Sequence, residues 1–293
     1  MKKLRLVFLC AAILAATVLS TVAEEKTLAP KLRFGLTAVT LEKNLSAHKR
    51  LVNLIEDKLG VPVEIVSRKS YQEMSFLLSN GQVDFAFVCG LPYVLDHDKF
   101  GLELLAVPVF KGKPVYQSYL ITHKSSPYAS LKDLRGKTFC FSDPLSNSGY
   151  LAPVFNLHKI GETPQSFFRS HFFSYSHYNC IEAVSVKLAD AANVDSYVWE
   201  TANTTSPEQT DQTKVIEKSE YMPITPMVVR PGLPEPLKRE LRGVFLNMGQ
   251  SRQGRLILEM MQLGGFAVGR DSDYDAIRAK GLQVSKSVAV EKK

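Results

Sequence analysis

Residues 142–153 read Ser-Asp-Pro-Leu-Ser-Asn-Ser-Gly-Tyr-Leu-Ala-Pro, and they place small polar side chains between an apolar strand and a helix. The strand is expected at 137–141, and apolar residues at helical spacing predict the helix at 150–160. The first backbone N–H groups of a helix lack intrahelical partners and lie at the positive end of its dipole. With the hydroxyls of Ser146 and Ser148 they form a site suited to an oxyanion. The alternative interpretation is that a serine only caps the helix.

The N-terminus has the pattern of a secretory signal peptide. Three basic residues among the first five precede the apolar run 6–19, and Ser20-Thr-Val-Ala23 ends the pattern before two glutamates. We therefore expect residues 1–23 to be cleaved off and the protein to be exported to the periplasm. The run is short for a membrane span, and Cys10 lacks the preceding small residue of a lipoprotein signal.

The composition of the mature chain excludes several classes of protein. Removing three basic residues of 36 leaves 33 Lys+Arg against 29 Asp+Glu, so the formal charge falls from +7 to +4. Basic residues are not interleaved with aromatic ones, which argues against a nucleic-acid partner. Cys89, Cys140 and Cys180 lack CxxC spacing, so we expect neither a metal site nor a cofactor. One disulfide between Cys140 and Cys180 and three buried thiols both remain open.

Strands and helices alternate along the chain in two series, which predicts two α/β lobes with parallel sheets. The predicted elements of the first series are strands at 31–36, 61–66 and 84–88 and helices at 44–59 and 71–78. Those of the second series are strands at 137–141, 172–175 and 191–194 and helices at 150–160 and 179–188.

Two extended segments, 116–122 and 221–229, are expected to cross between the lobes and to form a hinge. The amphipathic helices predicted at 234–248 and 253–263 would return to the first lobe. The expected organisation is a signal peptide at 1–23, a first lobe from 24–119 and 226–293, and a second lobe from 120–225. A ligand is expected in the cleft, at the carboxyl ends of the strands.

The run 131–153, with Ser176-His177 and Ala189-Asp-Ala-Ala192 further on, closely resembles the periplasmic phosphate/phosphite/phosphonate-binding proteins of ABC importers. The resemblance extends from about residue 32 to residue 278. It implies a type II periplasmic binding protein, whose two lobes close on a ligand like a clamshell.

The resemblance also implies the ligand-binding residues. The oxyanion turn of the family falls on Ser146, Asn147 and Ser148, and the family histidine on His177. The cleft tyrosines of the family match Tyr71 and Tyr116. Each of these side chains supplies a hydrogen-bond donor for a tetrahedral oxyanion. As alternatives, Tyr71 begins a helix, Tyr116 packs in a hinge strand, and His177 caps the helix that follows it.

Two further positions complete the predicted site. Tyr93 faces the cleft if the segment after Val88 is a loop at the end of its strand. Relatives that bind aminoalkylphosphonates carry an acidic residue in the second crossover, where this chain has Thr225. Their second acidic position falls near Ser196-Tyr197, with Asp195 close by but offset from it. We therefore expect no strong site for an ammonium group and a preference for small oxyanions.

The sequence thus predicts a periplasmic solute-binding protein that captures phosphite, phosphate or a phosphonate for an ABC transporter permease, and that acts as a monomer. His177 is expected to gain a proton near the anion, so that affinity rises as the pH falls. One alternative keeps the fold and changes the role, to a ligand sensor for a sensor kinase or a binder of another anion such as a sulfonate. A secreted serine hydrolase is the other, but the chain has no Gly-x-Ser-x-Gly elbow.

Overall fold

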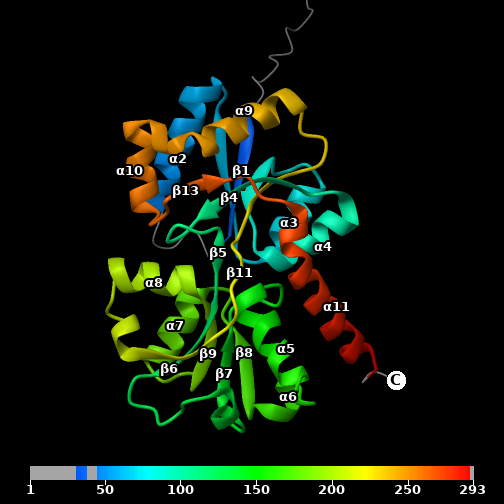
Figure 1. The fold of residues 1–293 in the computed structure, drawn as a ribbon, viewed down its shortest axis with the longest axis vertical. Helices are drawn as coiled ribbons and strands as arrows, with labels where there is room; N and C mark the ends of the chain where they lie inside the picture. The colour runs from blue at the N-terminus through cyan, green and yellow to red at the C-terminus, as the bar shows by residue number, and fades with distance from the viewer. Residues whose placement is uncertain (1–30, 38–44, 291–293) are drawn as a thin grey trace, which may run out of the picture. The chain divides into compact units, whose positions relative to one another are not determined.

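The computed structural model describes residues 31–37 and 45–290. These residues form two main β-sheets, both mixed, with helices on their faces (Figure 1). The expected signal peptide, residues 1–23, lies outside these residues. No helix in the described ranges is both long and apolar enough to cross a membrane.

The first lobe contains a six-stranded sheet in the order β13-β4-β12-β3-β1-β2. Its strands are β1 (Leu32–Thr37), β2 (Val63–Arg68), β3 (Phe85–Phe87), β4 (Glu103–Val109), β12 (Met227–Val229) and β13 (Gly265–Ala267). Its helices are α2 (Leu45–Leu59), α3 (Tyr71–Ser79), α4 (Gly90–Phe100), α9 (Glu235–Leu246) and α10 (Arg252–Met260). As expected, α9 and α10 return to this lobe, where α9 packs on β4 and α10 on α2.

The second lobe contains a five-stranded sheet in the order β10-β6-β9-β7-β8. Its strands are β6 (Ser118–His123), β7 (Thr138–Phe141), β8 (Ser170–Phe173), β9 (Ala191–Asp195) and β10 (Thr213–Lys218). Its helices are α5 (Ala152–His158), α6 (Pro164–Phe167), α7 (His177–Ser185) and α8 (Ser196–Thr205), and a π-helical turn, Asn147–Leu151, precedes α5.

The strands predicted in each of the two series are parallel to one another as expected, but both sheets are mixed because further strands join them. β1 is parallel to β2 and β3, and β7 is parallel to β8 and β9. By contrast, β12 is antiparallel to β3 and β4, and β6 is antiparallel to β9 and β10. β6 and β12 are the first strands after the two crossovers, and β13 is also antiparallel to its neighbour β4.

The crossovers themselves pair as a two-stranded ribbon, β5 (Val115–Tyr116) antiparallel to β11 (Met222–Pro223), which lies between the two sheets in Figure 1. The C-terminal helix α11 (Asp275–Val290) runs from the first lobe along the second and packs on both α4 and α5 (Figure 1). It therefore contacts both lobes, although residues 226–293 were expected to belong to the first.

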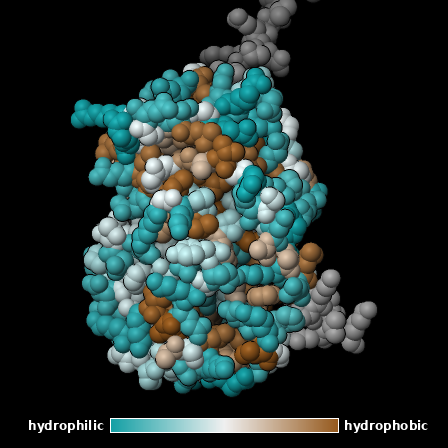
Figure 2. All heavy atoms as spheres, in the orientation of Figure 1, coloured by the Kyte–Doolittle hydropathy of each residue, from teal (hydrophilic) through white to brown (hydrophobic). Residues whose placement is uncertain are grey.

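The apolar core follows the sheets. One cluster fills the first lobe around Phe34, Phe85 and Phe245, and another fills the second around Ile121 and Ile181. A third is shared by the lobes and includes side chains of α3, α4, β7 and α5. Figure 2 shows a mostly hydrophilic face, with apolar side chains gathered over the six-stranded sheet. Since the shared cluster joins the lobes, the site described next is enclosed from two sides.

Candidate functional site

The serine turn follows β7 and begins the helix as expected, although three residues earlier. Ser146 is the N-cap, and its Oγ accepts a hydrogen bond from Gly149 N at 2.9 Å. The first turn is π-helical, because Leu151 N donates to Ser146 O at 2.9 Å. The capping interpretation therefore describes Ser146 correctly, but it does not account for Ser148.

Ser148 and Ser142 carry hydroxyls that are buried and make no hydrogen bond with the described residues. Ser148 Oγ lies beside the Tyr116 hydroxyl but outside hydrogen-bonding geometry with it. A buried hydroxyl without a partner costs free energy. These two hydroxyls are thus available to a bound molecule.

Gly149 brings the serine turn close to the neighbouring segments. A Cβ at this position would lie 1.9 Å from Ser142 Oγ and 3.0 Å from the His177 ring. Any side chain here would displace both neighbours, so glycine permits the close approach.

Most of the predicted residues gather around this turn. Asn147 Nδ2 donates to the Tyr116 hydroxyl at 3.0 Å, and Ser146 Oγ lies 3.5 Å from His177 Nε2. Tyr71 approaches from the first lobe, where its backbone N–H donates to Asp143 Oδ2 at 3.2 Å. The side chains of this group are at most 3% exposed: Tyr71, Tyr116, Ser146, Asn147, Ser148 and His177. We call these six residues the donor group.

The two tyrosines remain protonated. Burial raises the pKa of both Tyr71 and Tyr116 well above the ordinary value, and nearby acidic groups such as Asp195 add to this. Each therefore presents an O–H that can donate a hydrogen bond.

His177 is the first residue of α7, and Ser176 caps that helix by accepting from Asn179 N. Asp195 N donates to His177 Nδ1 at 3.2 Å, so the ring proton is on Nε2, which faces Ser146. Burial lowers the pKa of His177 to about 3. In the protein without ligand, the buried imidazole is therefore neutral between pH 5 and 8 and acts as an N–H donor.

Asp195 lies next to the donor group and was only a neighbouring position in the sequence interpretation. Its Oδ1 accepts from Tyr197 N at 2.8 Å and from Val198 N at 3.4 Å at the start of α8. Burial raises its pKa to about 7, although these backbone hydrogen bonds act in the opposite direction. Asp195 lies beside the donor group because it is the last residue of β9, which pairs with β7.

Cys89 is a second residue that the sequence interpretation missed. It precedes α4, and its Sγ accepts from Asn147 N at 3.2 Å, across the two lobes. Burial raises its pKa to about 11, so it remains a thiol. The segment after Val88 does reach the site, as expected, but through Cys89 rather than Tyr93.

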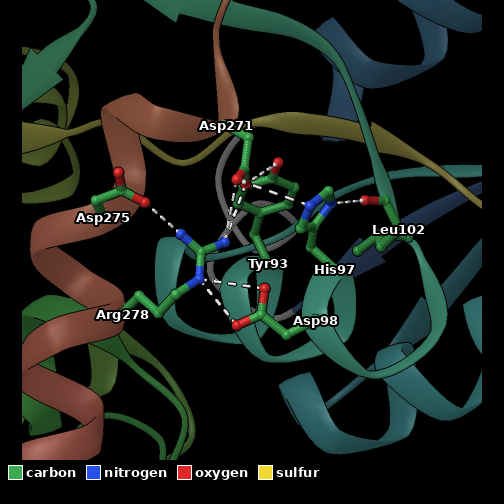
Figure 3. Close-up of polar contacts among 7 residues, drawn as sticks. All are labelled: Tyr93, His97, Asp98, Leu102, Asp271, Asp275 and Arg278. Atoms are coloured by element: carbon green, nitrogen blue, oxygen red, sulfur yellow. Dashed lines mark hydrogen bonds and ion pairs between the residues drawn. The ribbon is translucent and has the colours of Figure 1, made fainter.

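Tyr93 is not part of the donor group. Residues 90–100 form helix α4 instead of a loop, and the Tyr93 hydroxyl donates to Asp271 Oδ1 at 2.8 Å. Figure 3 shows Tyr93 and Arg278 converging on Asp271, so Tyr93 helps to anchor the C-terminal segment. Pro92 is compatible with the helix because it lies in the first turn, where an N–H has no intrahelical partner.

Thr225 lines a cavity of about 40 Å³ together with Asp195 and Tyr197, and no residue of the serine turn belongs to that lining. The remaining lining is mostly apolar: His48, Phe87, Pro108, Tyr178, Val198, Thr201, Ile224, Met261 and Leu263. Thr225 and Tyr197, the positions near which the resemblance places the acidic residues of the amine-binding relatives, thus line the same cavity.

Comparison with known proteins identifies the family. The profile described as "ABC transporter, phosphonate, periplasmic substrate-binding protein" matches residues 34–274. The phosphonates-binding periplasmic protein of Escherichia coli K12 is 30% identical over 257 residues, which cover 86% of this chain and 76% of the relative. This chain belongs to the periplasmic phosphonate-binding proteins of ABC transporters.

Solved structures of similar proteins agree with the fold. A binding protein component of an ABC phosphonate transporter from Pseudomonas aeruginosa superposes with a TM-score of 0.83 at 28% identity, over 90% of this chain and 89% of that one. PhnD1 from Prochlorococcus marinus, solved in complex with methylphosphonate, gives 0.79 at 20% identity, over 87% and 98%. The chain has the type II periplasmic binding protein fold of these phosphonate-binding proteins.

Proposed function

We propose that the donor group binds one small phosphorus oxyanion, and that the closed protein presents it to the permease of an ABC importer. The observation that carries the proposal is the pair of buried, unpartnered hydroxyls, Ser142 Oγ and Ser148 Oγ, beside the donors of the group. A tetrahedral oxyanion satisfies several donors at once. Hydrogen bonds to a charged group contribute about 1.5–3 kcal/mol each, and a micromolar dissociation constant needs about 8.2 kcal/mol. Five or six contacts therefore suffice after the costs of ordering.

We further propose that the site prefers phosphite, phosphate or methylphosphonate to aminoalkylphosphonates. The cavity beside Asp195, whose lining includes Thr225, has a volume of about 40 Å³ and a mostly apolar lining. Its carboxyl group, Asp195, already accepts two backbone hydrogen bonds and has a pKa of about 7. An ammonium group would lose its hydration there and find a carboxyl that is half protonated at neutral pH.

Competition calorimetry on the mature protein tests this preference. We expect phosphite, phosphate or methylphosphonate to bind tightest and aminoethylphosphonate to bind about 100-fold more weakly or worse. Thr225→Asp should improve aminoethylphosphonate binding, and the isosteric neutral control Thr225→Asn should not. The proposal is contradicted if aminoethylphosphonate is the tightest ligand of the wild type. Loss of that affinity in Asp195→Asn would then show that Asp195 binds the ammonium group.

We infer that the protein binds its ligand without turning it over. A serine hydrolase needs a histidine whose Nδ1–H is held by a carboxylate, whereas Nδ1 of His177 accepts from a backbone N–H. Release of product from phosphoesters or carboxyl esters that is abolished by Ser146→Ala would overturn this inference.

The proposed location is the periplasm, after cleavage of residues 1–23. Intact mass spectrometry of protein from a periplasmic extract should give a chain that begins at Glu24. Retention of Met1 to Ala23 in that fraction would contradict the signal-peptide interpretation.

A further inference from the structure

Two buried cysteines of the second lobe lie with their sulfur atoms in direct contact. Cys140 Sγ and Cys180 Sγ are 2.8 Å apart, and neither residue is exposed. Even two carbon atoms at optimal van der Waals separation are about 3.5–4.0 Å apart, and sulfur is the larger atom. Cys140 lies in β7 and Cys180 in α7, which packs on that strand.

We propose that Cys140 and Cys180 form a disulfide bond when the protein is exported. This proposal uses the periplasmic location proposed above, because disulfides form and persist in that compartment. The third mature cysteine, Cys89, stays a thiol, since it lies in the first lobe, where its Sγ accepts from Asn147 N.

The bond forms by thiol–disulfide exchange with an oxidant of the disulfide class, such as an oxidised dithiol oxidoreductase. One cysteine thiolate attacks the oxidant and forms a mixed disulfide, and the other thiolate displaces the oxidant as a dithiol. The two cysteines lose two protons and two electrons, and the oxidant gains them.

The exchange takes place before the pair is buried. In the folded protein, burial and the neighbouring Cys140 raise the pKa of Cys180 well above the ordinary value, so its reactive thiolate is scarce. The two residues are 40 positions apart, a loop long enough for the cross-link to restrict the unfolded chain strongly. Once formed, the bond is protected from reductants by the fold.

The cross-link would hold together the two elements that present the second-lobe donors. β7 leads directly into the serine turn, and α7 begins with His177. The disulfide therefore fixes the strand and the helix whose ends meet at Ser146 and His177.

Peptide mapping without reductant tests the bond on protein from the periplasm. The sample is quenched in acid, alkylated in denaturant and digested. We expect alkylation at Cys89 alone, and a peptide pair joined through Cys140 and Cys180 that is two hydrogens lighter than the two thiol peptides. Alkylation of all three cysteines, or a cross-link through Cys89, would overturn the proposal.

Thermal unfolding provides a second, independent measurement. Reduction in denaturant followed by refolding should lower the midpoint of the wild type by about 5–10 °C. Cys140→Ala/Cys180→Ala should unfold at one midpoint with or without reductant. Equal midpoints for oxidised and reduced wild type would count against the bond. Both measurements are made without ligand, so they are independent of which oxyanion the protein binds.

Discussion

Ser146 and Ser148 are two positions apart but differ in what their hydroxyls do. Ser146 Oγ holds the helix start through Gly149 N, whereas Ser148 Oγ has no partner among the described residues. A substitution at Ser146 would therefore mix effects on stability and on binding. A substitution at Ser148 separates the effect on binding from the effect on stability.

Ser148→Ala should weaken phosphite or phosphate binding by about 1–3 kcal/mol and leave the free energy of unfolding of the apo protein nearly unchanged. The matched control is Ser251→Ala, which removes the cap of α10 at Gly254 N. The control should cost about 1 kcal/mol of stability and leave affinity unchanged. Calorimetry and urea unfolding of both variants measure the two effects. The reverse pattern for Ser148 would make it only a structural residue.

His177 and Asp195 give opposite contributions to the pH dependence of stability. The pKa of His177 falls from 6.5 to about 3 on folding, so its contribution is lost as the pH falls below 6.5. The pKa of Asp195 rises from 3.8 to about 7, so its contribution is lost as the pH rises from about 4 to 7. Each group changes the free energy of unfolding by about 2 kcal/mol between pH 5 and 7. The two changes have opposite signs and nearly cancel.

The cancellation predicts variants with opposite slopes. Relative to wild type, Asp195→Asn should gain about 2 kcal/mol of stability between pH 5 and pH 7, and His177→Gln should lose about 2 kcal/mol over the same range. Urea unfolding of the apo proteins in phosphate-free buffers measures this. Parallel pH profiles for all three proteins would show that neither group has the shifted pKa that its burial implies.

At the scale of elements, the contacts of Arg278 fasten α11 to the first lobe. Its guanidinium reaches Asp98 on α4 at 2.8 Å, and Asp271 and Asp275 at 3.1 and 2.6 Å (Figure 3). The Arg278 side chain is 21% exposed, and hydrogen bonds to Asp98 in particular raise its pKa.

Arg278→Ala should lower the free energy of unfolding by about 1–2 kcal/mol, an amount limited by the solvent exposure of its partners. Arg270→Ala is the matched control, because its pair with Asp273 is exposed and local in sequence. It should cost less than about 0.5 kcal/mol. If the two variants unfold at the same urea concentration, the Arg278 contacts do not stabilise α11.

The elements that the sequence predicted well are those with a clear hydrophobic period. Helices α2 and α3 and strand β1 begin and end within two residues of the predicted bounds. The alternation of strands and helices predicted the parallel strands of each sheet. The antiparallel direction of β6 and β12 was not predictable, because a period of two is the same in parallel and antiparallel strands. Residues 90–100 were missed as a helix because Gly90 and Pro92 suggest a turn when the first-turn position of the proline is unknown.

The candidate site was predictable to the extent that it depends on strand ends. The serine turn and His177 come together because β7 and β8 are parallel neighbours whose following segments meet at one edge. The direction of Tyr93 was not predictable, since it depends on how α4 packs on Asp271 and Tyr274. Asp195 could have been found as an aspartate immediately after an apolar strand.

At the scale of the whole molecule, specific hydrogen bonds join the lobes in addition to the apolar cluster that they share. The Tyr197 hydroxyl in the second lobe donates to Met261 O in the first at 2.6 Å, and the Tyr197 ring packs edge-on against Phe110. A bond between lobes exists only when they are closed. It therefore favours the state in which the donor group is complete.

Tyr197→Phe should weaken oxyanion binding about 2- to 10-fold, because it removes one interlobe hydrogen bond and lowers the closed population. Tyr128→Phe is the control, since its hydroxyl donates to Asp190 within the second lobe. It should leave affinity unchanged. Calorimetry on the two variants decides the matter, and equal affinities would mean that this contact does not favour closure.

The order of strands along the chain also dictates when each sheet can be completed. The five strands of the second lobe all come from 118–218, one uninterrupted stretch. In the first lobe, β12 separates β3 from β4 and enters the chain more than a hundred residues after them. If the chain is exported with its N-terminus first, the two parts of the first sheet stay separate while the second sheet assembles. Until β12 has been exported, the edge of β3 and the edge of β4 that pair with it stay open. Open strand edges promote aggregation, so the nascent protein is most exposed to aggregation before β12 joins the sheet.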